Sequence, residues 1–220
     1  MVSVSIAIED PLSERVLRRL IYHTRRDWTV GSRYPLKALA GERLNLRNIT
    51  EKRGLSGYGQ IRAQLPAFNN LAKVKPFIVL TDLDIHVTCP GDLWAKWQPD
   101  AAKSPNLLFR VAVKEVEAWL LADRSNIADF LEVPIGDVLT DAEAAKDPKL
   151  EIVNLARRSR SIEVKHALVP PVGSVAAVGR SFDSKLIQFS TDFWDIEEAA
   201  KKSTSLRRAV RALERFKFVE

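Results

Sequence analysis

The pattern of apolar and polar positions in the first half of the chain predicts a series of strands. Residues 2–8 alternate apolar with small side chains, which is typical of a strand. Phe77–Leu80 and residues 107–113 are short apolar runs rich in β-branched and aromatic residues, and such runs indicate strands covered on both faces. A weaker extended segment surrounds Trp28. The chain therefore offers four candidate strands.

Helical spacing of apolar side chains fills the intervals between these strands. The predicted helices run from Leu12 to Arg25 with Ser13 as the expected N-cap, from the glycine-rich bend at 53–59 to Leu71, around Trp94, and over 115–122. Strands that alternate with helices are typical of an α/β fold with a mostly parallel sheet and helices on both faces.

The strand signals end near Asp123. Beyond it the pattern predicts short helices separated by Pro134, Pro148 and Pro170-Pro171, ending in an amphipathic segment over 205–218. We therefore expect an α/β core over residues 1–123 and a helical extension over 124–220 that packs on this core.

Composition adds information about location. No apolar run approaches the ~20 residues of a membrane-spanning helix, and the first residues lack the features of a signal peptide. Cys89 is the single cysteine among 220 residues, so an internal disulfide is excluded. These features predict a cytoplasmic protein without membrane association.

The net charge of +6 indicates a polyanionic partner, and the arginines that carry it are clustered. Three helical segments have more arginine than acidic neighbours, which suits phosphate binding, although solvated helix faces explain many of these residues equally well. The candidates for nucleic-acid contact are Arg157, Arg158, Arg207 and Arg211.

Carboxylates follow two of the predicted strands. Glu9 comes directly after the first strand, and Asp82 and Asp84 come directly after the strand at Phe77–Leu80. If these strands are parallel neighbours, the three carboxylates meet at one edge of the sheet and repel each other. A divalent cation relieves this repulsion, and Mg²⁺ prefers such hard oxygen ligands. The alternative is that the aspartates form a turn or cap the next helix.

These residues resemble the Toprim domain found in topoisomerases, primases and overcoming-lysogenization-defect nucleases. The whole chain is similar to a family of small Toprim-like bacterial proteins encoded beside ATPase genes in phage-defence clusters. The segments that carry the resemblance are Ile8–Glu14, Gly57–Gly59, Thr81–Asp84, Lys114–Asp123, Asp147–Lys149 and Thr204–Arg208. One departure is Asp10, which stands where Toprim proteins have glycine, so either Glu9 or Asp10 is the first-strand ligand.

The resemblance implies phosphodiester cleavage that depends on Mg²⁺, or on Mn²⁺ in its place. Glu9, Asp82 and Asp84 are then the ligands of one ion. A further metal or water ligand comes from Glu115 or Glu117, which lie about 200° apart on a helix, and we favour Glu117. Lys149 is expected to stabilise charge on the phosphate, while Asp147 caps a helix that has Pro148 at its first position.

The substrate expected from this resemblance is DNA or RNA, with an ATPase as a possible partner. Two alternatives come from other classes of protein. One is a non-catalytic subunit that binds nucleic acid or a partner protein. The other is a phosphatase of the haloacid-dehalogenase type, because that family also has an Asp-x-Asp motif after a strand, but on its opening strand.

Overall fold

A four-stranded parallel sheet organises the N-terminal half of the protein. The computed structural model describes residues 1–34, 57–83, 92–98 and 102–219. The strands are β1 (Val2–Ala7), β2 (Trp28–Arg33), β3 (Phe77–Asp82) and β4 (Leu107–Ala112), and their order across the sheet is β2-β1-β3-β4. All three neighbouring pairs are parallel, with a register shift between Val4 and Ser5 where β1 meets β2. The predicted α/β class with a parallel sheet is confirmed.

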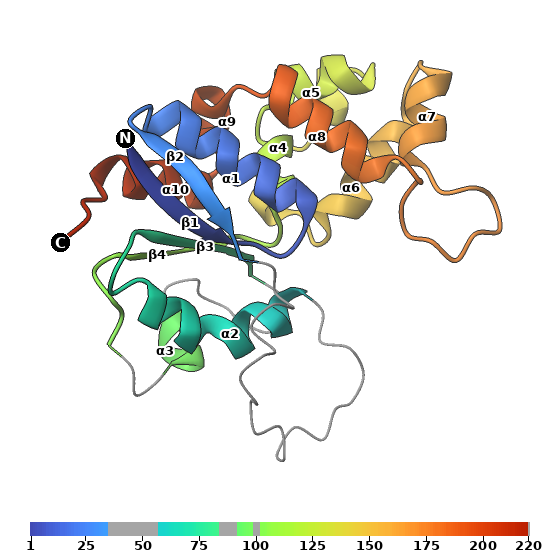
Figure 1. Ribbon diagram of the computed structural model, residues 1–220. Coiled ribbons are helices and arrows are strands. Elements are labelled where there is room, and N and C mark those ends of the chain that lie inside the picture. Colours follow the sequence, from blue (N-terminus) through green and yellow to red (C-terminus); the bar gives the residue numbers. More distant parts are fainter. Residues whose placement is uncertain (35–56, 84–91, 99–101, 220) are drawn as a thin grey trace.

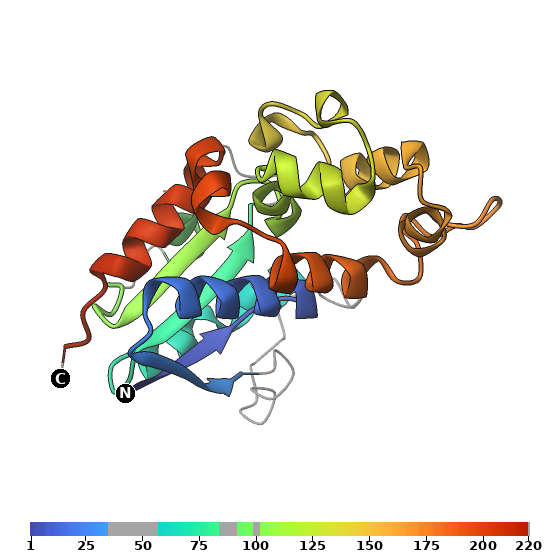
Figure 2. The ribbon, with the colours of Figure 1, turned by 90° about the horizontal axis from the view of Figure 1, so that it is seen from above.

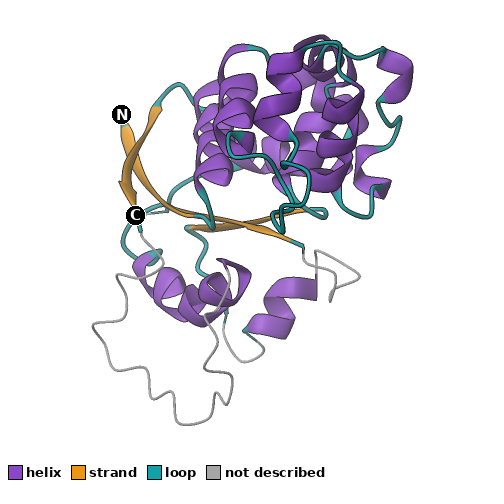
Figure 3. Ribbon diagram, turned by 90° about the vertical axis from the view of Figure 1, so that its right-hand side faces the viewer, coloured by secondary structure: helices purple, strands orange, loops and turns teal. Residues whose placement is uncertain are grey.

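Helices cover both faces of this sheet (Figure 1; Figure 3). One face carries α2 (Gly57–Leu71) and the short α3 (Leu93–Trp97). The other face carries α1 (Pro11–Thr24), α4 (Val116–Leu121) and the C-terminal α10 (Thr204–Arg215). Seen from above, α10 lies beside β4 (Figure 2).

The remaining helices form the predicted helical extension on the α1 side of the sheet. They are α5 (Arg124–Leu131), α6 (Pro148–Arg158), α7 (Ile162–Leu168), α8 (Phe182–Asp192) and α9 (Ile196–Lys202), with two short 3-10 helices, η4 (Ile135–Asp137) and η5 (Ala142–Ala144). None of the described helices is both long and apolar enough to cross a membrane.

Strand periodicity explains how one sheet supports two hydrophobic cores. On β3, Ile78 and Leu80 point into a large core that also contains Val16 of α1 and Leu186 of α8. Phe77 and Val79 point to the opposite side, into a smaller core against α2. Because the large core includes both sheet and C-terminal residues, the extension and the α/β core fold around shared apolar side chains.

The N-cap of α1 is not the residue that the sequence predicts. Asp10, not Ser13, is the N-cap, and its two carboxylate oxygens accept hydrogen bonds from the Ser13 backbone N–H (2.9 Å) and the Ser13 hydroxyl (2.7 Å). The intervening Pro11 has no N–H to lose and suits the first turn of the helix. Ser13 therefore lies inside the helix as a donor to the cap.

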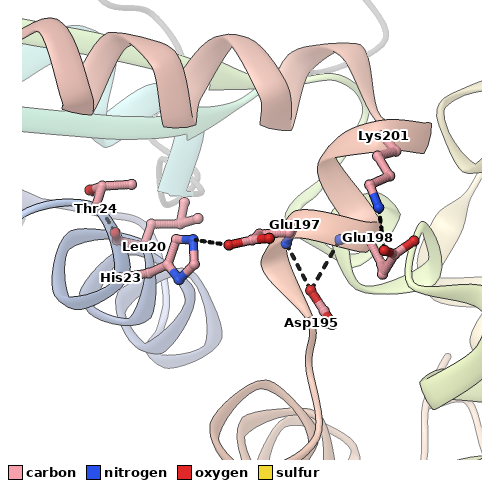
Figure 4. Close-up of polar contacts among 7 residues, drawn as sticks. All are labelled: Leu20, His23, Thr24, Asp195, Glu197, Glu198 and Lys201. Atoms are coloured by element: carbon pink, nitrogen blue, oxygen red, sulfur yellow. Dashed lines mark hydrogen bonds and ion pairs between the residues drawn. The ribbon is translucent and has the colours of Figure 1, made fainter.

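The opposite end of α1 contacts α9. The α9 helix begins at the N-cap Asp195, whose Oδ1 accepts from the backbone N–H groups of Glu197 and Glu198. Glu197 then extends toward His23 of α1, with 3.9 Å between Oε1 and Nε2 (Figure 4). This contact joins the helical extension to the first helix of the α/β core.

Candidate active site

The carboxylate of Glu9 contacts the end of β3, as the sequence predicts. Because Ala7 pairs with Val79 in parallel register, Glu9 lies opposite the last residues of β3. Its Oε1 accepts hydrogen bonds from the Thr81 hydroxyl (2.5 Å) and from the backbone N–H of Asp82 (3.2 Å). The carboxyl ends of β1 and β3 thus bring the first two predicted site residues together.

Asp82 connects the sheet to the start of α4. Its Oδ1 accepts a hydrogen bond from the backbone N–H of Val116, the first residue of that helix (3.1 Å). The turn before α4 is tied to the same strand end, because the backbone N–H of Leu83 donates to the carbonyls of Ala112 and Lys114. Lys114 has a φ of +65°, a left-handed conformation that is strained for a residue with a side chain.

This turn places both acidic residues of the α4 segment near the site. Glu117 lies in the first turn of α4 with only 3% of its surface exposed. Glu115 is the N-cap residue and has an extended backbone, so the helical angle of about 200° between the two does not apply. The expectation that only one of them can approach the site is therefore wrong. The Glu115 Oε2 atom is buried without a hydrogen-bond partner in the described part of the chain.

Lys149 enters the site from α6. Asp147 is the N-cap of that helix, Pro148 follows it at the first position, and the Asp147 Oδ1 accepts from the backbone N–H of Leu150 (2.8 Å). The predicted cap is confirmed. It leaves the Lys149 ammonium free to reach the Glu117 carboxylate, with 3.4 Å between Nζ and Oε1.

Like charges and burial shift the protonation equilibria of this cluster. Burial, followed by the carboxylates of Glu9 and Glu117, raises the pKa of Asp82 well above its usual range. Burial also raises the pKa of Glu117 to about 7, although the Lys149 ammonium opposes this shift. For Lys149, burial lowers the pKa, but the Glu117 and Glu115 carboxylates outweigh it and the net direction is upward.

The adjacent carboxylates of Glu9 and Asp10 have different hydrogen-bond partners. Asp10 uses both carboxylate oxygens to cap α1, whereas Glu9 is bonded to β3. This division favours Glu9 as the first-strand ligand, with Asp10 close enough to raise the pKa of Asp82 further. Asp84 lies outside the described residues.

The carboxylate oxygens at this site are the kind of ligand that a hard divalent cation prefers. Several carboxylates with raised pKa values share one edge of the sheet, and the Glu115 Oε2 has no hydrogen-bond donor among the described residues. Within those same residues, no three Asp, Glu, His or Cys side chains are placed to share an ion. In this arrangement Glu117 has the Lys149 ammonium as its counter-charge, and Glu9 is bonded to Thr81. A bound cation would therefore replace contacts that the protein now makes internally.

A cavity of about 580 Å³ opens beside this cluster. Glu115, Lys149 and Arg157 line it together with the segment 169–178, so one of the four predicted nucleic-acid contacts lies next to the acidic residues. The other three differ in their surroundings. Arg158 pairs with Asp137 (3.7 Å), Arg207 donates to the Ala200 carbonyl and the Thr204 hydroxyl, and Arg211 is exposed.

The four arginines do not form one surface. Arg157 and Arg158 belong to α6, and Arg207 and Arg211 belong to α10, and these helices lie at opposite ends of the helical layer (Figure 1). Any nucleic acid that contacted all four would have to run along the length of this layer.

No comparison with known proteins gave a match. This holds for the scan against protein-family models, for the curated proteins and for the solved structures. The geometry of the site is therefore the basis for assigning a function.

Thr81 was not among the predicted site residues, although its hydroxyl donates to Glu9. A signal for it exists in the sequence. Thr81 shares the strand face of Phe77 and Val79, and a polar residue at an otherwise apolar position on a buried strand indicates a specific hydrogen bond.

Proposed function

We propose that this protein is a Mg²⁺-dependent enzyme that cleaves phosphodiester bonds in nucleic acid. The observation that carries the proposal is the convergence of Glu9, Asp82 and Glu117 with Lys149 at the carboxyl edge of a parallel sheet, where such folds bind their ligands. Clustered carboxylates with raised pKa values beside a cation are typical of a functional site, because they oppose folding unless a ligand compensates them.

Each residue has a role that its environment supports. Glu9 and Asp82, with Asp84 after them, would hold the ion. A bound Mg²⁺ would activate water and neutralise the scissile phosphate. Glu117, with a pKa of about 7, is suited to accept a proton from water at neutral pH or to serve as a further ligand. The Lys149 ammonium would stabilise charge on the phosphate.

The substrate and partners belong to the same proposal. The Toprim-like resemblance and the net charge of +6 favour DNA or RNA. The same resemblance favours a cytoplasmic role as the effector of a phage-defence system, together with an ATPase. The strand that carries the Asp-x-Asp motif, β3, is third along the chain, which argues against a haloacid-dehalogenase-like phosphatase, whose motif follows the opening strand.

A non-catalytic subunit is the second candidate, and one observation favours it. The Lys149 ammonium already supplies Glu117 with a counter-charge, so the cluster holds part of its compensation without a ligand. On this alternative the acidic residues would serve only the fold.

Cleavage assays separate the two candidates. Purified protein is incubated with single- and double-stranded DNA and RNA in Mg²⁺, in Mn²⁺ or in EDTA, with and without a neighbouring ATPase. We expect cleavage only with metal, and a loss of at least a hundredfold in Asp82→Asn. Asp129→Asn is the matched control, because Asp129 is an exposed aspartate on α5 and does not belong to the cluster. Cleavage that persists in EDTA or in Asp82→Asn would contradict the proposal.

A further inference from the structure

A second pocket lies along the open edge of the sheet, on strand β4. Its volume is about 460 Å³, and none of the described residues that line it belongs to the carboxylate cluster. Its lining residues include Trp94 of α3 and Arg208 of α10 beside the edge strand β4. These two helices lie on opposite faces of the sheet (Figure 1). A volume of this size suits a small ligand.

Three cations line this pocket, and none of them has a carboxylate partner in the part of the chain that the structure describes. Lys103, Arg110 and Arg208 come from the segment before β4, from β4 itself and from α10. Over the described residues, none of the three has a carboxylate oxygen within 4 Å. Within the described residues, the Arg110 Nε donates to the carbonyl of the preceding residue, Phe109 (2.6 Å).

The charges of Lys103 and Arg110 act on each other. Burial lowers the pKa of Arg110, and burial followed by the Arg110 charge lowers the pKa of Lys103. Two cations that repel each other in a pocket resemble, with opposite sign, the carboxylate cluster at the end of β3. An anion between them would relieve the repulsion.

Among the described residues, Glu143 is the one carboxylate that lines the pocket, and its Oε1 already accepts hydrogen bonds. That atom accepts hydrogen bonds from the Ser203 hydroxyl (2.6 Å), the Ser205 backbone N–H (2.7 Å) and the Ser205 hydroxyl (2.6 Å). These bonds hold η5 against the N-terminus of α10. Glu143 therefore serves the helix terminus and is not an ion-pair partner of the three cations.

Two aromatic rings form part of the pocket wall. Trp94 of α3 is half-buried and lines the pocket with Phe109 of β4, and their ring centres lie 5.8 Å apart in an edge-to-face arrangement. Trp97 also contacts the Phe109 ring in an edge-to-face arrangement, with 5.7 Å between the ring centres. An aromatic wall beside guanidinium groups is the combination that binds a base and its phosphate.

We propose that this pocket binds a nucleoside phosphate, with the cations of β4 and α10 on the phosphate and Trp94 beside the base. Guanidinium groups bind phosphate through charge-assisted hydrogen bonds, and an aromatic side chain stacks on any base. The ligand is either a free nucleotide or the terminal nucleotide of a strand. The site does not depend on the carboxylate cluster and does not require the proposed cleavage activity.

Calorimetry in EDTA with ATP, AMP and inorganic phosphate tests this site without metal. We expect ATP to bind, and Arg208→Gln and Arg110→Gln each to weaken it at least fivefold. Arg215→Gln is the matched control, since Arg215 is an exposed arginine on the same helix outside the pocket, and it should leave the affinity unchanged. Because Arg208 is exposed, its variant avoids any loss of folding that Arg110→Gln causes.

The base and the source of the nucleotide are tested in the same assay. Trp94→Ala should weaken ATP at least fivefold and leave inorganic phosphate unaffected. If a 5′-phosphorylated oligonucleotide displaces ATP and its 5′-hydroxyl form does not, the ligand is a strand terminus. If neither oligonucleotide displaces ATP, the ligand is the free nucleotide. Asp82→Asn should bind ATP normally, which separates this site from the cleavage proposal. Absence of ATP binding at millimolar concentration, or binding that Arg208→Gln and Arg110→Gln leave unchanged, would overturn the inference.

Discussion

Individual carboxylates determine the chemistry available at the sheet edge, and Glu117 is the most informative of them. It is almost fully buried, has a pKa of about 7 and contacts the Lys149 ammonium. Glu115 is two residues away, is less buried and lies on the wall of the neighbouring cavity. The two glutamates therefore form a natural pair of variants.

We expect Glu117→Gln to lower cleavage by a hundredfold or more, because an amide can neither accept a proton nor act as an anionic ligand. Glu115→Gln should change turnover only several-fold. Turnover and substrate affinity are measured for both. Equal and mild effects would show that this segment is scaffold, and a loss of substrate binding would indicate that the variants disturb the fold.

The charge of Asp82 makes stability depend on pH. Since its folded-state pKa is raised, ionised Asp82 destabilises the protein above that pKa, and the destabilisation disappears as the pH falls through it toward the unfolded value of 3.8. In EDTA at pH 8, Asp82→Asn should be more stable than wild type, because the amide has no charge that burial and the neighbouring carboxylates oppose. The amide oxygen can still accept from Val116, so the α4 contact is preserved.

Thermal unfolding at pH 8 and pH 4 measures this difference. Asp82→Asn should have the higher Tm at pH 8, where each kcal/mol of added stability corresponds to roughly 2–4 °C. The difference in Tm should shrink at pH 4. A variant that is less stable than wild type by the same amount at both pH values would identify Asp82 as a structural residue.

At the scale of elements, the turn between β4 and α4 positions Glu115 and Glu117. Lys114 holds this turn in a left-handed conformation, and its carbonyl accepts from Leu83 at the end of β3. Glycine adopts this φ without steric cost, whereas alanine retains the Cβ that opposes it.

We therefore expect Lys114→Gly to be more stable than Lys114→Ala by about 1 kcal/mol. The alanine variant is the control for loss of the lysine side chain. Denaturant unfolding of both proteins gives the comparison. If Lys114→Ala is as stable as Lys114→Gly, the left-handed backbone of this turn carries no strain.

The helices and strands also show which structural features could be predicted from the sequence. Strands and helices were predictable because their apolar periodicities of 2 and 3.6 are strong, and the meeting of Glu9 with Asp82 followed from parallel pairing. The approach of Glu115 was not predictable, because it depends on the N-cap position of one short helix. The cations on β4 and α10 are nearly 100 residues apart in sequence, so only the packing of α10 beside β4 unites them.

At the scale of the whole molecule, positive charge is distributed over separate helices. Arg157 borders the cavity beside the acidic cluster, while Arg211 lies on α10 at the other end of the helical layer. Arg158 is paired with the Asp137 carboxylate and Arg207 donates to the Thr204 hydroxyl, whereas Arg157 donates to the neutral side chain of Asn154 on its own helix. A nucleic acid bound to this layer would therefore make its phosphate contacts mainly with Arg157 and Arg211.

Affinity for nucleic acid should therefore fall steeply with salt. Each phosphate contact contributes about −0.7 to −0.9 to the slope of log affinity against log salt concentration. Arg157→Gln and Arg211→Gln should each flatten the slope by about that amount, and Arg158→Gln should have a smaller effect. Fluorescence anisotropy at salt concentrations between about 50 and 300 mM measures these slopes. A wild-type affinity that does not respond to salt would exclude these helices as a phosphate-binding surface.

The most direct test of the metal-dependent site is calorimetric titration of Mg²⁺ and Mn²⁺ into wild type and Asp82→Ala. The clustered carboxylates of Glu9, Asp82 and Glu117 predict saturable binding to wild type that Asp82→Ala abolishes, while the variant stays folded. Absence of metal binding by wild type, or equal binding by Asp82→Ala, would contradict the account.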